Sequence, residues 1–270
     1  MKVIRIVAIL VLTLILGCSS HEELPPPDNP FDPGNPDYVF PEAEIISGPT
    51  EGEIIESTSV TLVWQGNESA TEYRYKFDSV TWSDWDETTS QTFDYLDEGM
   101  HNLELQAQSI NGDEQTIPTL LEFEVDAVAG PSALVYPYEQ AGSPGDTLIY
   151  QIVAEDVTDL FAVECLIVLD DQLEIIETAD GDLLSEWGGN PLVIMDLQPG
   201  HLNLSIASVE GTNTAFTGSS TIVSLVVRIK PDASVNAFLN ALTISDVIYL
   251  QPNLERIASI EVRAGIVNVY

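Results

Sequence analysis

Apolar and polar residues alternate along most of the chain after residue 43. The runs 59–64 and 101–107 are clear examples, because apolar side chains recur in them at every second position. Alternation with this period is typical of a strand that buries one of its two faces. Turn residues such as those at 111–113 separate the runs at a spacing found in sandwiches. We therefore expect an all-β protein.

The alternating runs fall into two groups, separated by a short segment at 127–131 that contains glycine and proline. The first group occupies residues 44–127 and the second residues 131–270. No long amphipathic helix stands out, and a short one fits only at 179–187. Because 44% of the chain is hydrophobic, each group can bury a core. We predict two β-sandwich domains that fold independently.

The N-terminus has the composition of an exported precursor. Residues 1–17 combine a basic start with an apolar run that is shorter than the roughly 20 residues a membrane-spanning helix needs. The stretch 15–18 resembles the lipobox of bacterial lipoproteins. We predict that 1–17 is a signal peptide and that Cys18 carries the lipid, the alternative being an ordinary signal peptide that ends near a cysteine. By the same resemblance, Ser19 favours sorting to an outer membrane.

Residues 18–43 are rich in proline and read as a tether. Proline at this density favours extended chain, so the segment is expected to hold the domains away from the membrane. The lipid on Cys18 is then the expected membrane anchor, and the protein should lie in the cell envelope, at an outer membrane or the cell surface. With Cys18 acylated, Cys165 has no partner for a disulfide. We expect Cys165 to be an inert core thiol.

The chain is strongly acidic. It carries 44 acidic and 8 basic residues, a net charge of −36. Nucleic acid is excluded as a partner, because phosphate binding needs clustered Lys and Arg. The charge also disfavours direct contact with anionic lipid. It keeps the protein soluble and could attract a basic partner.

Several motifs of the first group occur together in a known kind of module. They are Tyr73-Arg74-Tyr75, Trp82-Ser83-Asp84-Trp85 and the segments 98–101 and 107–112. In this combination they resemble the small immunoglobulin-like or fibronectin-III-like modules of bacterial surface proteins. The resemblance covers about residues 43–127 and implies a β-sandwich without a disulfide.

An ordered series of short motifs runs through the second group. Its members are the segments 145–150, 157–162, 169–175, 181–184, 217–220 and 265–269. This series resembles the cohesin domain, the receptor module of cellulosome scaffolds. The resemblance implies a nine-strand jelly-roll sandwich with one flat sheet face that binds a partner, typically a calcium-loaded dockerin on an enzyme. Any calcium is then expected to be supplied by the partner.

The strand expected at 161–169 lies at the centre of that face. Its odd positions are apolar and should point into the core, while Ala162, Glu164, Leu166 and Val168 point outward. Leu and Val are unusual on a solvent face, so these four residues either form a partner-binding patch or are covered by loops. Many cohesins have Asn and Asp where this chain has Ala162 and Glu164. The contacts with a partner are therefore expected to differ.

No catalytic constellation can be assembled from the sequence, and we predict a protein without enzymatic activity. His21, His101 and His201 lie in unrelated settings and form no recognisable metal triad. Neither a serine-elbow motif nor a phosphate loop is present. The acidic residues at 170–171 and 180–182 could offer oxygen ligands to calcium, but they lack the spacing of an EF-hand and fit solvated turns better.

Trp82 and Trp85 are candidates for a platform on which sugar rings stack. If the segment is a strand, the two indoles point to opposite faces, so that one is in the core and one is free. Two functions stay open besides a catalytic subunit, which the missing constellation disfavours. The first is a surface lipoprotein whose cohesin-like domain binds a dockerin-like protein in extracellular assembly or polysaccharide degradation. The second is a carbohydrate-binding surface lipoprotein.

Overall fold

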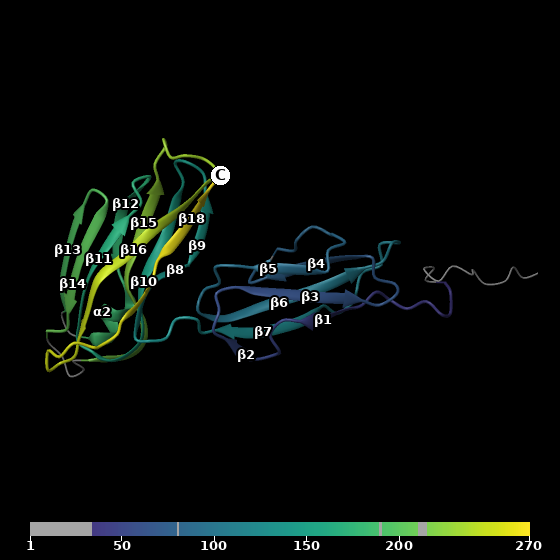
Figure 1. The fold of residues 1–270 in the computed structure, drawn as a ribbon, viewed down its shortest axis with the longest axis horizontal. Helices are drawn as coiled ribbons and strands as arrows, with labels where there is room; N and C mark the ends of the chain where they lie inside the picture. Colours follow the sequence, from purple (N-terminus) through teal and green to yellow (C-terminus); the bar gives the residue numbers. More distant parts are fainter. Residues whose placement is uncertain (1–33, 80, 189–190, 210–214) are drawn as a thin grey trace, which may run out of the picture.

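The computed structural model describes residues 34–79, 81–188, 191–209 and 215–270. Within these ranges the chain is almost entirely β-strand, as expected, and forms two sandwiches that lie end to end (Figure 1). The predicted signal peptide and Cys18 lie outside the described residues. No helix in the described ranges is long and apolar enough to cross a membrane.

The first sandwich packs a sheet of three strands on a sheet of four. Its strands are β1 (Ala43–Ser47), β2 (Glu53–Ile55), β3 (Val60–Gly66), β4 (Glu72–Phe77), β5 (Ser90–Phe93), β6 (Gly99–Gln108) and β7 (Thr119–Val125). The sheets have the orders β1-β3-β5 and β2-β7-β6-β4. Strand β2 pairs with β7 in parallel, whereas the remaining pairs of this sandwich are antiparallel.

The second sandwich packs a sheet of five strands on a sheet of six, in the orders β12-β15-β10-β8-β17 and β13-β14-β11-β16-β18-β9. The strands are β8 (Ser132–Tyr136), β9 (Glu139–Gly142), β10 (Thr147–Leu160), β11 (Ala162–Leu169), β12 (Leu173–Asp180), β13 (Leu192–Gln198), β14 (His201–Ala207), β15 (Phe216–Ile229), β16 (Ala237–Leu250), β17 (Glu261–Arg263) and β18 (Gly265–Val269). The helix α2 (Asp182–Trp187) falls where a short helix was expected.

Two connections divide the second sandwich into more strands than the nine that the cohesin resemblance implies. Pro137 separates β8 from β9, and Ala264 separates β17 from β18. In both cases the chain crosses from the five-stranded to the six-stranded sheet. Each of the two segments therefore contributes one strand to each sheet. The first and last segments then pair in parallel, β17 with β8 and β18 with β9.

Each sandwich has its own hydrophobic core. In the first, Trp64 is 2% exposed, and its indole N–H donates a hydrogen bond to the carbonyl of Thr88 at 3.1 Å. In the second, the hydroxyls of Tyr150 and Tyr249 donate to backbone carbonyls at 2.6 and 3.0 Å. Because these buried polar groups are all hydrogen-bonded, the cores carry large aromatic residues without an unpaired donor.

The last residues of the predicted tether pack on the first sandwich. The hydroxyl of Tyr38 donates to a carboxylate oxygen of Asp113 at 2.7 Å. The side-chain amide of Asn67 donates to the carbonyl of Phe40 at 2.7 Å. The chain is thus held against the first domain before β1 begins.

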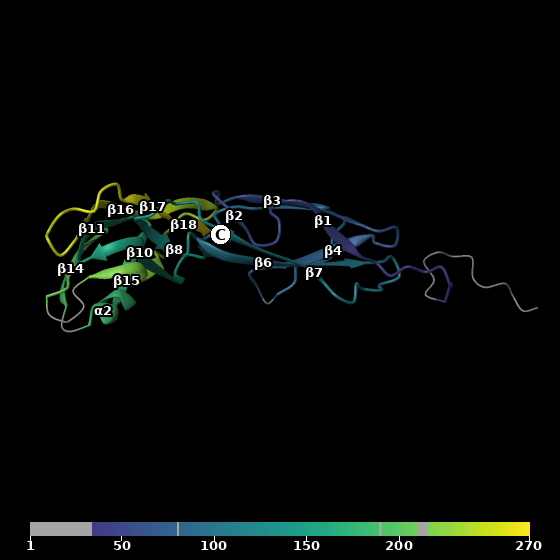
Figure 2. The same cartoon turned by 90° about the horizontal axis from the view of Figure 1, so that it is seen from below.

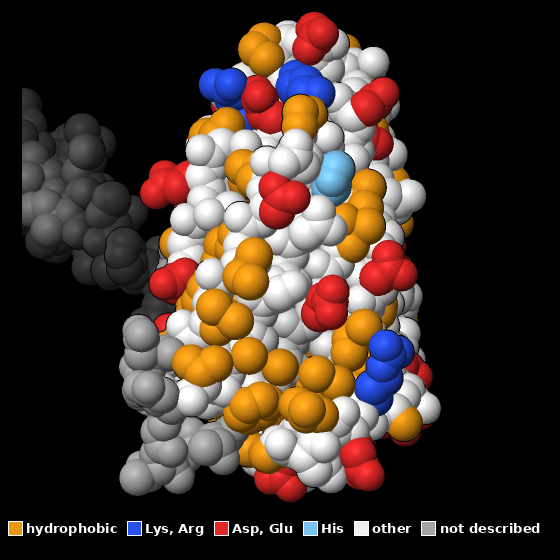
Figure 3. All heavy atoms as spheres, turned by 90° about the vertical axis from the view of Figure 1, so that its left-hand side faces the viewer, with side chains coloured by type: hydrophobic (Ala, Val, Ile, Leu, Met, Phe, Trp, Pro, Cys, Tyr) orange, Lys and Arg blue, Asp and Glu red, His pale blue; other side chains and the backbone are white. Residues whose placement is uncertain are grey.

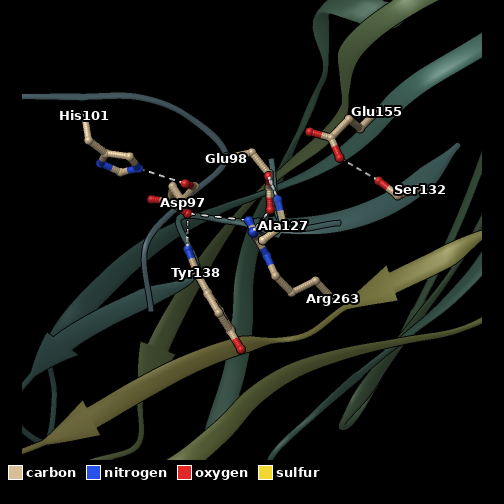
Figure 4. A network of polar contacts seen from close by, with 8 residues as sticks. All are labelled: Asp97, Glu98, His101, Ala127, Ser132, Tyr138, Glu155 and Arg263. Carbon is tan, nitrogen blue, oxygen red and sulfur yellow. Dashed lines mark hydrogen bonds and ion pairs between the residues drawn. The ribbon is translucent and has the colours of Figure 1, made fainter. Parts of the chain in front are cut away.

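A network of polar contacts lies at the junction between the two sandwiches (Figure 4). Arg263 of the second domain is 7% exposed and donates to Glu98 of the first at 2.5 Å. It also lies 3.7 Å from the carboxylate of Asp97 and 4.7 Å from the ring centroid of Tyr138. The backbone N–H of Tyr138 donates to Asp97 at 2.6 Å. Desolvation raises the pKa of both carboxyl groups, and hydrogen bonds and the charge of Arg263 partly offset that rise.

These contacts fix the orientation of the second domain relative to the first. The strands of the first sandwich follow the long axis of the molecule in Figures 1 and 2, and those of the second run obliquely to it in Figure 1. The side formed by β13 and β14 lies farthest from the first domain. A surface on that side is therefore exposed at the distal end of the molecule.

Candidate partner-binding face

Strand β11 has the orientation expected from its alternation. Val163, Cys165, Ile167 and Leu169 are buried. Glu164 and Val168 are exposed, the latter by 39%, and Ala162 and Leu166 are half-buried on the same side. The four residues assigned to the partner-binding patch therefore share the outer side of the six-stranded sheet. Whether they bind a partner stays a prediction.

The pairing register shows which residues flank them. Ala162 lies between Ala207 of β14 and Leu250 of β16. Glu164 lies between Ser205 and Ile248 in the next row. Strand β13 extends these two rows with Leu192 opposite Ala207 and Ile194 opposite Ser205. We call the outer side of β13, β14, β11 and β16 the candidate face.

The candidate face is divided into an apolar and a polar half. The two rows just described are mostly apolar, and Leu192 and Ile194 are 49% and 54% exposed. The next row contains Asp196, Asn203, Leu166 and Ser245. Figure 3, which looks onto this side of the molecule, shows the hydrophobic side chains gathered in its lower half and acidic groups scattered around them.

A shallow hollow of about 130 Å³ lies within the apolar half. Its walls come from β11, β13, β14 and β16, with Leu192, Ile248 and Leu250 as the large side chains. The carboxylate of Glu164 also lines it and makes no hydrogen bond or ion pair within the described part of the chain. This hollow can therefore receive an apolar side chain beside a negative charge.

Cys165 lies directly beneath the candidate face. Its side chain is 4% exposed and points into the core. Burial, with a smaller contribution from the nearby Glu164, raises the pKa of the thiol to about 12. The thiol is therefore protonated at neutral pH, which matches the inert role expected for it.

The two tryptophans of the predicted sugar platform are not arranged as expected. Both are half-buried on the outer side of the four-stranded sheet, and neither is in the core. The guanidinium of Arg74 lies 4.7 Å from the ring centroid of Trp82 and 4.3 Å from that of Trp85. The reason is that residues 81–86 form an irregular segment and not a strand, so the rule of opposite faces does not apply.

His101 is the buried histidine of the first sandwich. It is 6% exposed, with Nδ1 in contact with a carboxylate oxygen of Asp78 and Nε2 2.8 Å from the carbonyl of Asp97. Burial lowers the pKa of His101, but these hydrogen bonds and the two acidic side chains outweigh it and raise the pKa overall. No group of three or more possible metal-ligating side chains gathers anywhere in the described ranges.

Sequence reasoning assigned the outward residues of only one of the four strands of the candidate face. It missed Leu192, Ile248 and Leu250, which line the hollow, and the neighbouring Ile194 of β13. A signal was present in residues 192–197, because apolar residues there occupy both alternating positions. Such a run indicates a strand with apolar side chains on both faces.

The sequence matches no family model and none of the curated proteins compared with it. Solved structures that resemble the chain are cohesin domains. A cohesin of scaffoldin B from Acetivibrio cellulolyticus, solved in complex with a dockerin, is 16% identical, with a TM-score of 0.44. The match covers 53% of this chain and 100% of that cohesin.

Two further matches are of the same kind. A non-cellulosomal cohesin from the archaeon Archaeoglobus fulgidus is 11% identical, with a TM-score of 0.42, over 52% of this chain and 90% of that one. A type II cohesin from Acetivibrio cellulolyticus is 17% identical, with a TM-score of 0.42, over 51% and 94%. The structures found are thus cohesin domains, each matched over about half of this chain.

Proposed function

We propose that this protein is a non-catalytic surface lipoprotein whose second domain binds a protein partner through the candidate face. The contiguous apolar patch on that face carries the proposal. Monomeric soluble proteins seldom expose a large apolar patch, and one bordered by polar residues is typical of an interaction site. The position of the patch at the distal end of the molecule leaves it accessible (Figure 3).

The charges of the chain favour a partner with basic groups. The protein has a net charge of −36, and Glu164 and Asp196 stand in and beside the apolar rows. A partner that places an apolar ridge in the hollow, with Lys or Arg beside it, complements both features. The opposite charge also speeds the encounter, most strongly at low salt.

The resemblance of the sequence to cohesins gives the class of partner: a dockerin-like module in an extracellular assembly or in polysaccharide degradation. Ala162 and Glu164 occupy the positions where many cohesins have Asn and Asp. We propose that the neighbouring apolar groups, mainly Ile194, Ile248 and Leu250, replace that polar recognition. Calcium enters only as part of the partner.

The location follows from the proposed anchor. Lipid on Cys18 holds the chain at an outer membrane or cell surface, and residues 18–43 separate the membrane from the first sandwich. The first sandwich then acts as a spacer, because it lies between the start of the described chain and the second sandwich.

Capture of proteins from the native secretome tests this function. The full-length protein is immobilised through its C-terminus, and Ile194→Lys is compared with Ile149→Lys. Ile194 is 54% exposed on the candidate face, and Ile149 is 60% exposed on β10 of the opposite sheet. We expect the unchanged protein and Ile149→Lys to capture the same partner, and Ile194→Lys to lose it by tenfold or more, because an ammonium group must be desolvated in the interface.

A chelator should also release the partner if it is a calcium-loaded module. Equal capture by the two lysine variants would show that the partner does not use the candidate face. Capture that ignores calcium would remove the dockerin-like class and leave the face as a site for another protein.

Carbohydrate binding is a second candidate function, favoured by the position of Trp82 and Trp85 on one side of the sheet. Arg74 lies against both rings, so a sugar could stack only on the remaining surfaces of the indoles. Titration with soluble polysaccharides, followed by tryptophan fluorescence, tests the idea. Binding should disappear in Trp85→Ala and persist in Ile194→Lys. If neither the unchanged protein nor Ile194→Lys shows a fluorescence change, the platform is excluded.

A further inference from the structure

The edges of β-sheets expose unpaired backbone groups, and proteins protect them from pairing with other chains. In the described ranges most edge strands of this protein are protected. Strands β2, β5, β9 and β17 have four residues or fewer. Strands β1 and β12 contain bulges, and β12 also carries Glu174, Glu177 and Asp180. These features disfavour regular pairing with another strand.

The remaining edge of the first sandwich is covered. The backbone of Tyr73 in β4 exchanges hydrogen bonds of 2.7 and 3.0 Å with that of Asp86. The N–H of Ser83 donates to the carbonyl of Tyr75 at 2.8 Å. The segment that contains Trp82 and Trp85 therefore occupies the position that an added strand would take.

Strand β13 lacks all of these protections. Its seven residues pair with β14 without a bulge, and they include no proline and no basic residue. Asp196 is its one charged residue. The apolar side chains Leu192, Ile194 and Leu197 are 49%, 54% and 46% exposed. No residue within the described part of the chain pairs with its outer edge.

A groove runs beside the end of β13. Its volume is about 380 Å³, and it separates the last residues of β13 from the first residues of β12 in the other sheet. Leu173, Ile175 and Leu197 contribute its apolar lining. A strand added to the edge of β13 therefore meets apolar surface on its inner side as well as free backbone groups.

We propose that β13 pairs with β13 of a second copy of this chain, antiparallel and about a two-fold axis at Met195. In this register Val193 faces Leu197 of the second copy on the inner side, and Ile194 faces Asp196 on the outer side. All seven residues of the strand are then paired. The two six-stranded sheets join into one continuous sheet through an interface that is identical from both sides.

The distribution of charge favours a second copy as the occupant. The chain has a net charge of −36, so contacts between copies elsewhere bring like charges together. At β13 the proposed register places Asp196 opposite an isoleucine and not opposite another acid. The partner strand must itself be nearly uncharged and alternate in the same way, and β13 meets both conditions.

Such a dimer presents two candidate faces side by side on one continuous sheet. Leu192 and Ile194 of each copy lie on the outer side, next to the joint. A partner with two binding modules could engage both copies, and the second contact would be intramolecular.

Site-specific cross-linking tests the register. In Met195→Cys the two introduced thiols sit opposite each other, with Cβ atoms about 5 Å apart, within reach of a disulfide. In Leu192→Cys the two thiols are separated by six residues along the joined strands, a distance of about 20 Å. We expect mild oxidation of the full-length protein in its membrane to cross-link Met195→Cys and not Leu192→Cys. Failure to cross-link at 195, or equal yields at both positions, would overturn the proposal.

Sedimentation of the full-length protein in mild detergent gives an independent test. We expect a dimer that becomes tighter when salt is raised from about 0.1 to about 1 M, since the Debye length falls from about 10 to about 3 Å and like charges are screened. Leu197→Lys should weaken the dimer tenfold or more, while Leu254→Lys, at a 68% exposed position outside β13, should not. A monomer under all these conditions, or equal effects of the two variants, would overturn the proposal.

Discussion

Two neighbouring residues of β11 have opposite environments. Leu166 is half-buried on the candidate face, and Ile167 is fully buried in the core. We expect Leu166→Lys to cost about 1 kcal/mol of unfolding free energy or less, because its ammonium group stays in water. Ile167→Lys should unfold the second domain, since a charge in the core has no partner. Urea denaturation of both variants checks this; similar losses of stability would mean that the outer side of β11 is not open to solvent.

The thiol of Cys165 gives a second test at single-residue scale. A pKa of about 12 leaves almost no thiolate at pH 8, and the side chain is 4% exposed. Alkylation by iodoacetamide should therefore modify Cys165 only after the protein is unfolded in guanidinium chloride. Peptide mass spectrometry identifies the modified residue. Rapid labelling in the native protein would show that the second sandwich opens far more often than its core suggests.

Strand β6 carries a titratable group whose charge affects the stability of the first sandwich. His101 has a raised pKa in the folded state, so its contacts with Asp78 and Asp97 stabilise most at a pH below about 6.5, the usual histidine value. That stabilisation is lost as the pH rises through the folded-state pKa. We expect the unfolding free energy of the first domain to fall above pH 6.5. Denaturant melts at several pH values measure this.

The matched variants for this prediction are His101→Gln and His201→Gln. The first removes the titrating group from β6 and should abolish the decrease, while the second changes a half-buried residue of the other domain and should leave it intact. A decrease that persists in His101→Gln would assign the pH dependence to other groups.

Most strands could be predicted from their alternation alone. Strand β14 (His201–Ala207) is an example, because its inner residues are apolar and its outer residues are mostly polar or small. Strands β8 and β9 were not predicted, since both are short and the chain crosses between the layers at Pro137. Alternation reports which side of a strand is buried, but not where a segment changes sheet.

The candidate face could be predicted only in part, for a related reason. The sequence assigned the outward side of β11, but the patch is formed by neighbours that come from distant parts of the chain. Ala162 pairs with Leu250 and with Ala207, and neither pairing is encoded locally. Register and neighbour identity depend on the whole sheet. The same limit explains Trp82 and Trp85, whose position is set by the irregular segment that covers β4.

At the scale of the whole molecule, the joint at Arg263 decides whether the domains move together. We expect Arg263→Ala to loosen the junction, because it leaves Glu98 and Asp97 desolvated without their cation, a change that typically costs about 3 kcal/mol. Spin labels at positions 120 and 149, on β7 and β10, should give one narrow distance distribution in the parent protein and a broad one in Arg263→Ala.

Arg228→Ala is the matched control for this measurement. Arg228 forms an ion pair with Glu174 inside the second domain, but its side chain is 43% exposed. Surface pairs of this kind contribute little, so the distance distribution should stay narrow. Equally narrow distributions in both variants would mean that the aromatic contacts of Tyr95 with Tyr138 and Phe238 hold the domains without the arginine.

The parallel pairing of β2 with β7 gives the first sandwich a defined response to mechanical load. The chain enters this sandwich through β1 and β2 and leaves it through β7. A pull on the two ends of this sandwich therefore draws β2 and β7 in opposite directions along their common axis. Their hydrogen bonds, in the register from Glu53 opposite Phe123 to Ile55 opposite Val125, are sheared together and not opened one after another. Sharing the force in this way keeps the first sandwich folded under load.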